Sequence, residues 1–67
     1  MTLAQNLRRL RNKAKLTQAE LAERAAVPQQ TVSRLELGAA IDPRYSTLRA
    51  LADVLDISTD DLAGKSR

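Results

Sequence analysis

The amino-acid sequence predicts an all-α fold with five helices and no strands. Apolar residues recur at intervals of three and four, which is the period of a helix with one buried face. Helix-capping residues precede these runs, and turn-forming residues such as Gly38 and Asp42-Pro43 separate them. Because 67 residues provide for one small core, we expect a single domain spanning residues 1–67.

The first helix is expected over residues 2–15. Its apolar positions follow one another at spacings of four, three and four, which places them on one face. The predicted buried stripe consists of Leu3, Leu7, Leu10 and Ala14.

A second helix is predicted to begin after Thr17, because Thr is a good N-cap and Glu20 stands three residues later, as in a capping box. Leu16 and Leu21 have the spacing of a hydrophobic staple across this helix start. The buried face is expected to contain Leu21, Ala22 and Ala25.

A tight turn at residues 25–27 leads to a third helix over residues 28–37. Val27 is expected to fill the core between the two helices, and Pro28 suits a helix start because its missing N–H is no loss there. Val32 and Leu35 point inward, and Gly38 is well placed to end the helix.

After a loop at residues 39–45, a fourth helix is expected over residues 46–56 and a fifth from Ser58 onward. The fourth buries Leu48, Leu51, Ala52 and Leu55. Ser58 and Asp61 have capping-box spacing, and Ile57 and Leu62 have staple spacing. Residues 64–67 are expected to be frayed.

Charge is distributed unevenly along the chain, whose formal net charge is +3. Residues 1–19 hold five of the 11 basic side chains and no acid, so the remainder carries six bases and eight acids, a balance of −2. A basic first helix could contact phosphates. An ordinary solvated helix face explains the same charges.

The composition excludes several classes of function. Cysteine and histidine are absent, which removes disulfides and the commonest metal ligands and general base, so we expect no metal and no cofactor. Thr17, Ser33, Asp60 and Asp61 have no activating partner in the sequence, and we expect no catalytic residues. No apolar run reaches the roughly 18 residues of a membrane span, and no signal peptide is recognisable, which indicates a cytoplasmic protein. With one Tyr and no Phe or Trp, stacking on single-stranded bases is disfavoured.

The stretch Leu16–Gly38 resembles the helix-turn-helix of the lambdoid phage repressor and Cro family, also called the XRE-type family. The matching residues are Thr17-Gln18-Ala19-Glu20-Leu21-Ala22, Gln29-Gln30, Val32, Leu35-Glu36 and Gly38. The resemblance implies a five-helix, lambda-repressor-like DNA-binding domain with its helix-turn-helix at residues 17–37. Family members often have Gly at the position of Ala26, where the backbone tends to be left-handed.

Four side chains on the third helix are candidates for contacting DNA bases. Glutamine can pair with adenine, and arginine with guanine, in the major groove. The resemblance places Gln29 and Gln30 at base-contacting positions of the phage repressors. The predicted set, opposite Val32 and Leu35, is Gln29, Gln30, Ser33 and Arg34.

Further side chains are candidates for phosphate contacts or for holding the helices together. By resemblance, Gln18 contacts a phosphate and braces the first recognition glutamine, and Arg44 follows the DNA backbone. Arg11 and Glu36 match a structural ion pair of the phage repressors. The predicted phosphate contacts are Thr17, Gln18, Arg44 and, as a second role, Arg11.

The function expected from these features is that of a transcriptional regulator, in particular a repressor that binds double-stranded DNA as a homodimer on a palindromic operator. By resemblance, the dimer contact lies at residues 55–64, with Ile57 and Leu62 as contributors. A rival reading buries Leu62 inside its own monomer. Two other functions stay open: an antitoxin or restriction-modification controller that also binds a protein such as a toxin, and a helical interaction module without DNA binding.

Overall fold

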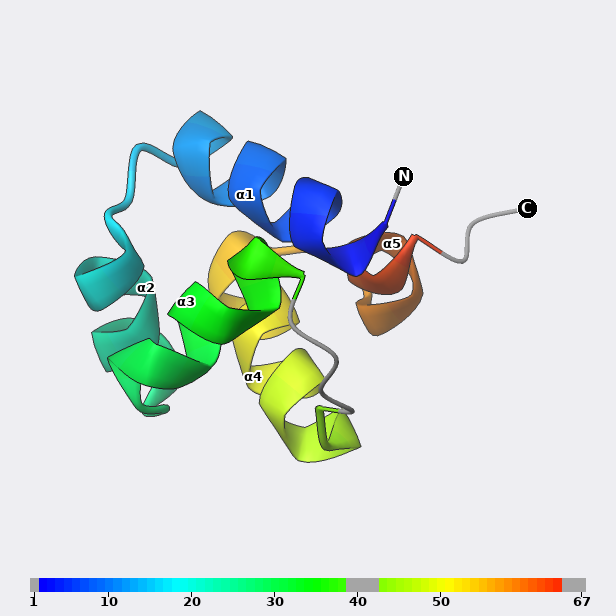
Figure 1. Cartoon of the computed structure of the whole chain (residues 1–67). Coiled ribbons are helices and arrows are strands. Elements are labelled where there is room, and N and C mark those ends of the chain that lie inside the picture. The colour runs from blue at the N-terminus through cyan, green and yellow to red at the C-terminus, as the bar shows by residue number, and fades with distance from the viewer. Residues whose placement is uncertain (1, 39–42, 65–67) are drawn as a thin grey trace.

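The computed structural model describes residues 2–38 and 43–64 (Figure 1). This part of the chain contains five α-helices and no strand, which confirms the predicted fold class. Their bounds differ from the predicted ones by a residue or two at the ends. The helices are α1 Leu3–Lys13, α2 Gln18–Ala25, α3 Gln29–Leu37, α4 Tyr45–Leu55 and α5 Thr59–Ala63.

Side-chain caps explain where three of the helices begin. At the start of α2, Thr17 Oγ1 accepts a hydrogen bond from the Glu20 backbone N–H at 3.0 Å, and the Thr17 N–H donates to Glu20 Oε1 at 2.8 Å. This is the predicted capping box. Thr2 and Gln5 form a second box at the start of α1, and Ser58 Oγ accepts from the Asp61 N–H at the start of α5.

Left-handed residues end the later helices. Gly38 follows α3 with φ +74°, a conformation that favours glycine because a Cβ atom is strained there. Ala26 follows α2 with φ +57°, as the resemblance implied. The turn it makes lets the Val27 N–H bond to the Ala22 carbonyl oxygen at 3.0 Å.

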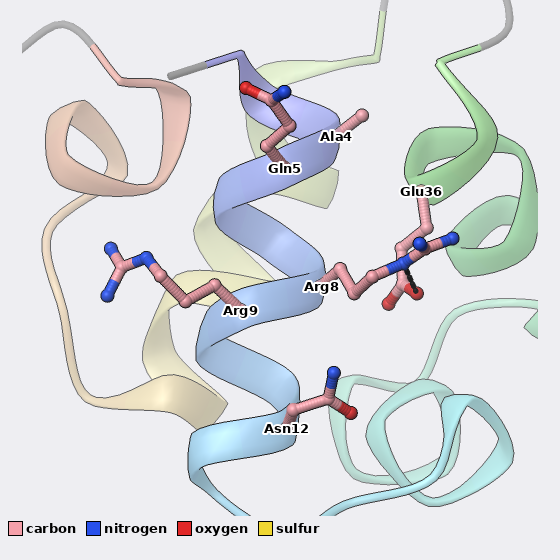
Figure 2. Close-up of a pocket in the computed structure, with 6 residues that line it drawn as sticks. All are labelled: Ala4, Gln5, Arg8, Arg9, Asn12 and Glu36. Carbon is pink, nitrogen blue, oxygen red and sulfur yellow. Dashed lines mark ion pairs between the residues drawn. The ribbon is translucent and has the colours of Figure 1, made fainter.

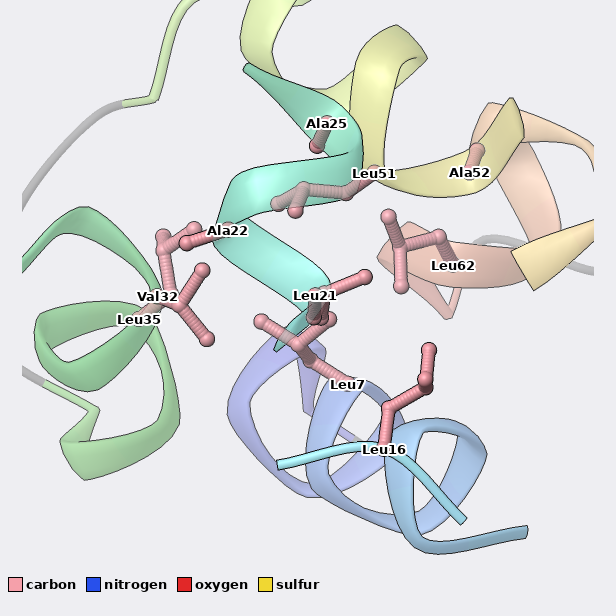
Figure 3. Packing of buried hydrophobic residues seen from close by; sticks show 10 residues of the cluster. All are labelled: Leu7, Leu16, Leu21, Ala22, Ala25, Val32, Leu35, Leu51, Ala52 and Leu62. Atoms are coloured by element: carbon pink, nitrogen blue, oxygen red, sulfur yellow. The ribbon is translucent and has the colours of Figure 1, made fainter. Parts of the chain in front are cut away.

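Each helix contributes one completely buried large side chain to a common core (Figure 3). Burial of such a side chain stabilises the fold by about 1.5–3 kcal/mol. Smaller side chains on α2 and α4, together with Leu16 before α2, fill the space around them. The five residues are Leu7, Leu21, Val32, Leu51 and Leu62.

The principal helix packings form a closed ring. α1 packs against α3, α3 against α2, α2 against α4, α4 against α5, and α5 against α1 (Figure 1). The last of these contacts includes a buried amide: Asn6 Nδ2 donates to the carbonyl oxygens of Asp61 and Leu62 at 3.2 and 3.4 Å. α5 is thereby fixed to the first helix of the chain.

Two predictions about buried residues were wrong. Ala14 is exposed, because α1 ends before it and the chain turns through Lys15 at φ +60°. Leu62 is 0% exposed within the monomer, because the α5 turn inserts it between α1 and α4. Leu62 therefore cannot contribute an apolar surface to a dimer contact.

Within the described residues, the longest helices have 11 residues, and none is long and apolar enough to cross a membrane.

Candidate nucleic-acid interface

The third helix has one buried and one exposed face. Val32, Leu35 and Glu36 are buried, so the opposite side of α3 is turned to solvent. Of the four predicted base-contacting residues, Gln29, Gln30 and Arg34 are exposed and Ser33 is half-buried. The structure thus brings these residues together on one accessible helix face.

A short connection fixes the direction of α3 relative to α2. The left-handed Ala26 turns the chain, Val27 packs partly buried against the core, and Pro28 holds extended backbone with φ −61° and ψ 140° before the helix begins. The Thr31 N–H then donates to the Pro28 carbonyl oxygen at 3.0 Å. The polar face of α3 is consequently presented by a constrained helix and not by a loop.

An ion pair connects α3 to α1. Arg11 Nε lies 2.6 Å from Glu36 Oε2, and Arg11 Nη2 donates to Glu36 Oε1 at 2.9 Å, which makes the pair bidentate. Arg11 Nη1 also donates to the Leu16 carbonyl oxygen at 2.8 Å. The Arg11 side chain is only 13% exposed. Because each nitrogen of its guanidinium donates a hydrogen bond inside the monomer, these contacts favour a structural role for Arg11 over phosphate binding.

The Glu36 carboxylate receives two further contacts. Gln18 Nε2, on the first turn of α2, donates to Glu36 Oε1 at 3.2 Å. Arg8 Nε on α1 lies 3.8 Å from the same oxygen, and Figure 2 shows this ion pair. One carboxylate therefore holds α1, α2 and α3 together.

These contacts decide the ionisation of Glu36. Burial raises the pKa of this carboxyl, but the hydrogen bonds from Arg11 and Gln18 and the nearby charges of Arg11 and Arg8 outweigh burial, so its pKa is lowered. The hydrogen bond to Glu36 likewise raises the pKa of Arg11. The pair is therefore ionised at neutral pH.

The predicted phosphate-contacting residues differ in their exposure and in their hydrogen bonds. Thr17 is exposed at the start of α2, with its hydroxyl accepting the cap hydrogen bond. Gln18 is half-buried and bonded to Glu36, whereas the resemblance implied that it braces Gln29; no Gln18–Gln29 bond is present within the described residues. Arg44 is exposed at the N-cap position of α4. The loop residues 39–42 before it lie outside the described residues.

An open hollow of about 250 Å³ lies beside the Glu36 contacts. Figure 2 shows Arg8 reaching from α1 toward Glu36, whereas Arg9 extends from the other side of α1. Because the two guanidinium groups do not converge, the hollow offers no enclosed anion site. Its lining consists of Ala4, Gln5, Arg8, Arg9, Asn12 and Glu36. Within the described ranges, no group of three or more His, Cys, Asp or Glu side chains could hold a metal ion.

Two residues of this region were missed by the sequence predictions. Arg8 joins the Glu36 contacts, and the signal for this was its i, i+3 spacing from Arg11 on the same face of α1. Leu37 is 74% exposed at the end of α3. The signal for Leu37 was its i+4 spacing from Ser33, which places it on the polar face.

Comparison with known proteins agrees with this geometry. The family described as helix-turn-helix matches residues 7–62. A Bacillus subtilis (strain 168) protein named uncharacterized HTH-type transcriptional regulator YqaE is 34% identical over 59 residues, which cover 88% of this chain and 50% of that protein. The chain thus spans about half the length of this curated relative.

Two solved structures are similar throughout most of the chain. Both have a TM-score of 0.86, 28% sequence identity and 91% coverage of this chain. One is described as a SinR protein/SinI protein complex, of whose matching chain 59% is covered. The other is described as the master regulator for biofilm formation, SinR, in complex with DNA, with 97% of that chain covered.

Proposed function

The chain belongs to the helix-turn-helix family, and from this premise we propose that it is a transcriptional regulator that binds specific sequences of double-stranded DNA. The observation that carries the proposal is the exposed polar face of α3, which is held in place by the buried Glu36 carboxylate. The SinR structure with DNA and the name of the YqaE relative support it. We propose a regulator without catalytic activity that acts in the cytoplasm.

In this proposal α3 enters the major groove and reads base edges. The amides of Gln29 and Gln30 can bond to adenine, and the Arg34 guanidinium to guanine. Ser33 lies between them and can bond to either kind of base edge. The exposure of Gln29, Gln30 and Arg34 supports this assignment.

Phosphate contacts would position α3 on the duplex without reading sequence. We propose Thr17 and the first turn of α2 for one phosphate, where free backbone N–H groups favour an anion. We propose Arg44 for another, because its side chain is exposed at the start of α4. Gln18 would have to share its amide between Glu36 and the DNA.

We further propose that the regulator binds as a homodimer and represses by occupying a promoter. One recognition helix reads only a few base pairs, so two copies are needed for a specific site. The contact would lie near residues 55–61, where Ile57 is half-buried and retains accessible apolar surface. A two-fold dimer places half-sites about 10 base pairs apart.

A protein partner is a second candidate for part of the function. The similar SinR/SinI structure contains two different proteins, and this favours a regulator that also binds another protein. A toxin or a restriction system encoded beside this chain would support the antitoxin or controller form of the proposal.

Selection of bound sequences from random double-stranded DNA tests the proposal. We expect a selected motif that is palindromic, with half-sites about 10 base pairs apart, and the complex on it to contain two copies in sedimentation. A single half-site bound by one copy would contradict the homodimer alone. If no sequence is enriched and no salt-dependent binding is measured, the chain is an interaction module and the DNA-binding proposal is wrong.

A further inference from the structure

Leu37 lies at the C-terminal end of α3 and projects in the middle of its exposed face when the helix is viewed along its axis. At about 100° per residue, it projects about 80° from Gln29 and about 60° from Arg34. Its exposure of 74% agrees with this position. The leucine therefore shares the face of the amides and the guanidinium, with a direction between those of Gln29 and Arg34 and a position one turn further along the helix.

Neither core packing nor helix capping accounts for this leucine. Leu35, two residues earlier, is 3% exposed and belongs to the core, whereas Leu37 has no part in the core. Gly38 ends the helix by its own left-handed backbone. Among the described residues, none packs the isobutyl group of Leu37 into the core, so this side chain is available to another molecule that covers α3.

We propose that Leu37 is a specificity-determining residue that contacts the 5-methyl group of a thymine in the major groove. The inference rests on the proposed function, in which α3 lies in that groove. Apolar side chains contact the thymine methyl, which no other DNA base carries in unmodified DNA. Leu37 would thus add thymine to the adenine and guanine edges that the amides and Arg34 can read.

The spacing between Arg34 and Leu37 along α3 indicates which thymine is read. Leu37 lies three residues after Arg34, or about 4.5 Å along the helix axis at about 1.5 Å per residue. This distance is on the scale of one base-pair step, about 3.4 Å. With α3 lying along the groove in the proposed complex, the thymine lies within one or two base pairs of the base that Arg34 reads.

Replacing thymine by deoxyuridine removes only the methyl group and gives a direct test. The probe is the duplex selected by the wild-type chain, in which each thymine is replaced in turn. We expect one position per half-site where the replacement weakens wild-type binding about fourfold, the value of one buried methyl group. Leu37→Ala should bind the unmodified duplex less tightly and lose its sensitivity to that replacement.

Two controls keep the test specific. Tyr45→Ala removes the other large, exposed apolar side chain among the described residues, and its sensitivity to deoxyuridine should match the wild type. The melting midpoint of Leu37→Ala should stay close to that of the wild type, because the side chain is not packed in the core.

The outcomes separate this inference from the proposed function. If the wild type selects a sequence but shows no methyl-sensitive thymine, or if Leu37→Ala keeps the same sensitivity, the thymine contact is wrong and DNA recognition stands. If Leu37→Ala binds all duplexes as the wild type does, Leu37 faces a protein partner instead. If no sequence is selected at all, both the function and this contact are wrong.

Discussion

The Glu36 side chain is only 1% exposed, a position where an unpaired charge would be very costly. It is accommodated because Arg11 binds both carboxylate oxygens and Gln18 donates to one of them. Since Glu36 lies on α3 and its partners on α1 and α2, this single side chain couples the stability of the fold to the placement of α3. Two predictions at the scale of the residue follow from this coupling.

Glu36→Ala should destabilise the protein by about 3 kcal/mol, because it leaves Arg11 largely buried without its partner. Chemical unfolding monitored by circular dichroism measures the free energy of unfolding. The matched control is Glu23→Ala on the exposed surface of α2, for which we expect a change within about 0.5 kcal/mol. Equal stabilities of the two variants would contradict a structural role for the ion pair.

Acidification should also weaken the fold through Glu36. Its pKa is lowered in the folded state, so its contribution is complete above the unfolded-state value of about 4.3 and is lost as the pH falls through the lower folded-state pKa. The melting temperature of the wild type should therefore decrease as the pH is lowered below about 4.3. Glu36→Gln should show a shallower fall than Glu23→Gln; identical pH profiles would refute this assignment.

The exposed residues of α3 should affect sequence discrimination and not stability. Gln29→Ala and Arg34→Ala should each weaken binding to the selected sequence by about 1–3 kcal/mol, the worth of a good base contact, while nonspecific binding changes little. Titration of both variants against selected and random duplexes checks this. Equal losses on the two kinds of DNA would remove these residues from the base-reading set.

Residue partners could be predicted from the sequence only in part. The Arg11–Glu36 pair follows from the resemblance and is present. The orientation of Gln18 could not be predicted, because its amide could bond to Gln29 or to Glu36. The packing of α2 against α3 determines which of the two is within reach. It bonds to Glu36 at 3.2 Å, whereas the resemblance implied Gln29.

At the scale of the element, the connection between α2 and α3 contains a residue ill suited to its backbone. Ala26 adopts φ +57°, where an L-residue with a Cβ atom is strained by roughly 1 kcal/mol. The chain tolerates this because Val27 and the helices on either side pack against the core. The direction of α3 is therefore maintained at a small cost in stability.

Ala26→Gly should raise the free energy of unfolding by up to about 1 kcal/mol, because glycine adopts the left-handed region without strain. The greater conformational entropy of glycine in the unfolded chain offsets part of this gain. The control is Ala19→Gly at an exposed position in the first turn of α2, which should lower stability, by at most about 1 kcal/mol. Thermal melting of both variants decides the sign. A loss of stability in Ala26→Gly would show that the alanine methyl makes a favourable contact.

The capped helix starts could be predicted from the sequence, whereas the end of α1 could not. Thr17 and Ser58 cap α2 and α5 as expected, because a cap is determined by the residue itself and its neighbour three positions later. The predicted end of α1 is too late, because Ala14 and Lys15 are compatible with a helix but the chain turns at Lys15, and Leu16 then packs in the core.

At the scale of the whole molecule, the buried position of Leu62 shows what a sequence pattern leaves open. An apolar residue on a short amphipathic helix can be buried by its own domain or by a second copy, and the sequence is the same in both cases. The choice depends on how far α5 folds back onto α1 and α4, and in this chain Leu62 is fully buried by its own domain.

Among the proposed phosphate contacts Arg44 carries a full charge, and the salt dependence of binding measures its contribution. Arg44→Ala should lower the affinity for all duplexes and reduce the slope of log affinity against log salt by about one unit. Arg9→Ala removes the same charge on the side of α1 away from Glu36 (Figure 2) and should leave the slope unchanged. An unchanged slope for Arg44→Ala would exclude its phosphate contact.

The Asn6 hydrogen bonds have a consequence for synthesis of the chain. They join residues 55 and 56 positions apart, and the contact between α1 and α5 closes the ring of helices. While residues 61 and 62 are still inside the ribosome, the Asn6 amide lacks its two carbonyl acceptors. The core then also lacks Leu62, one of its five completely buried large side chains. The domain is therefore expected to fold as a unit once Leu62 has emerged from the ribosome, and not helix by helix.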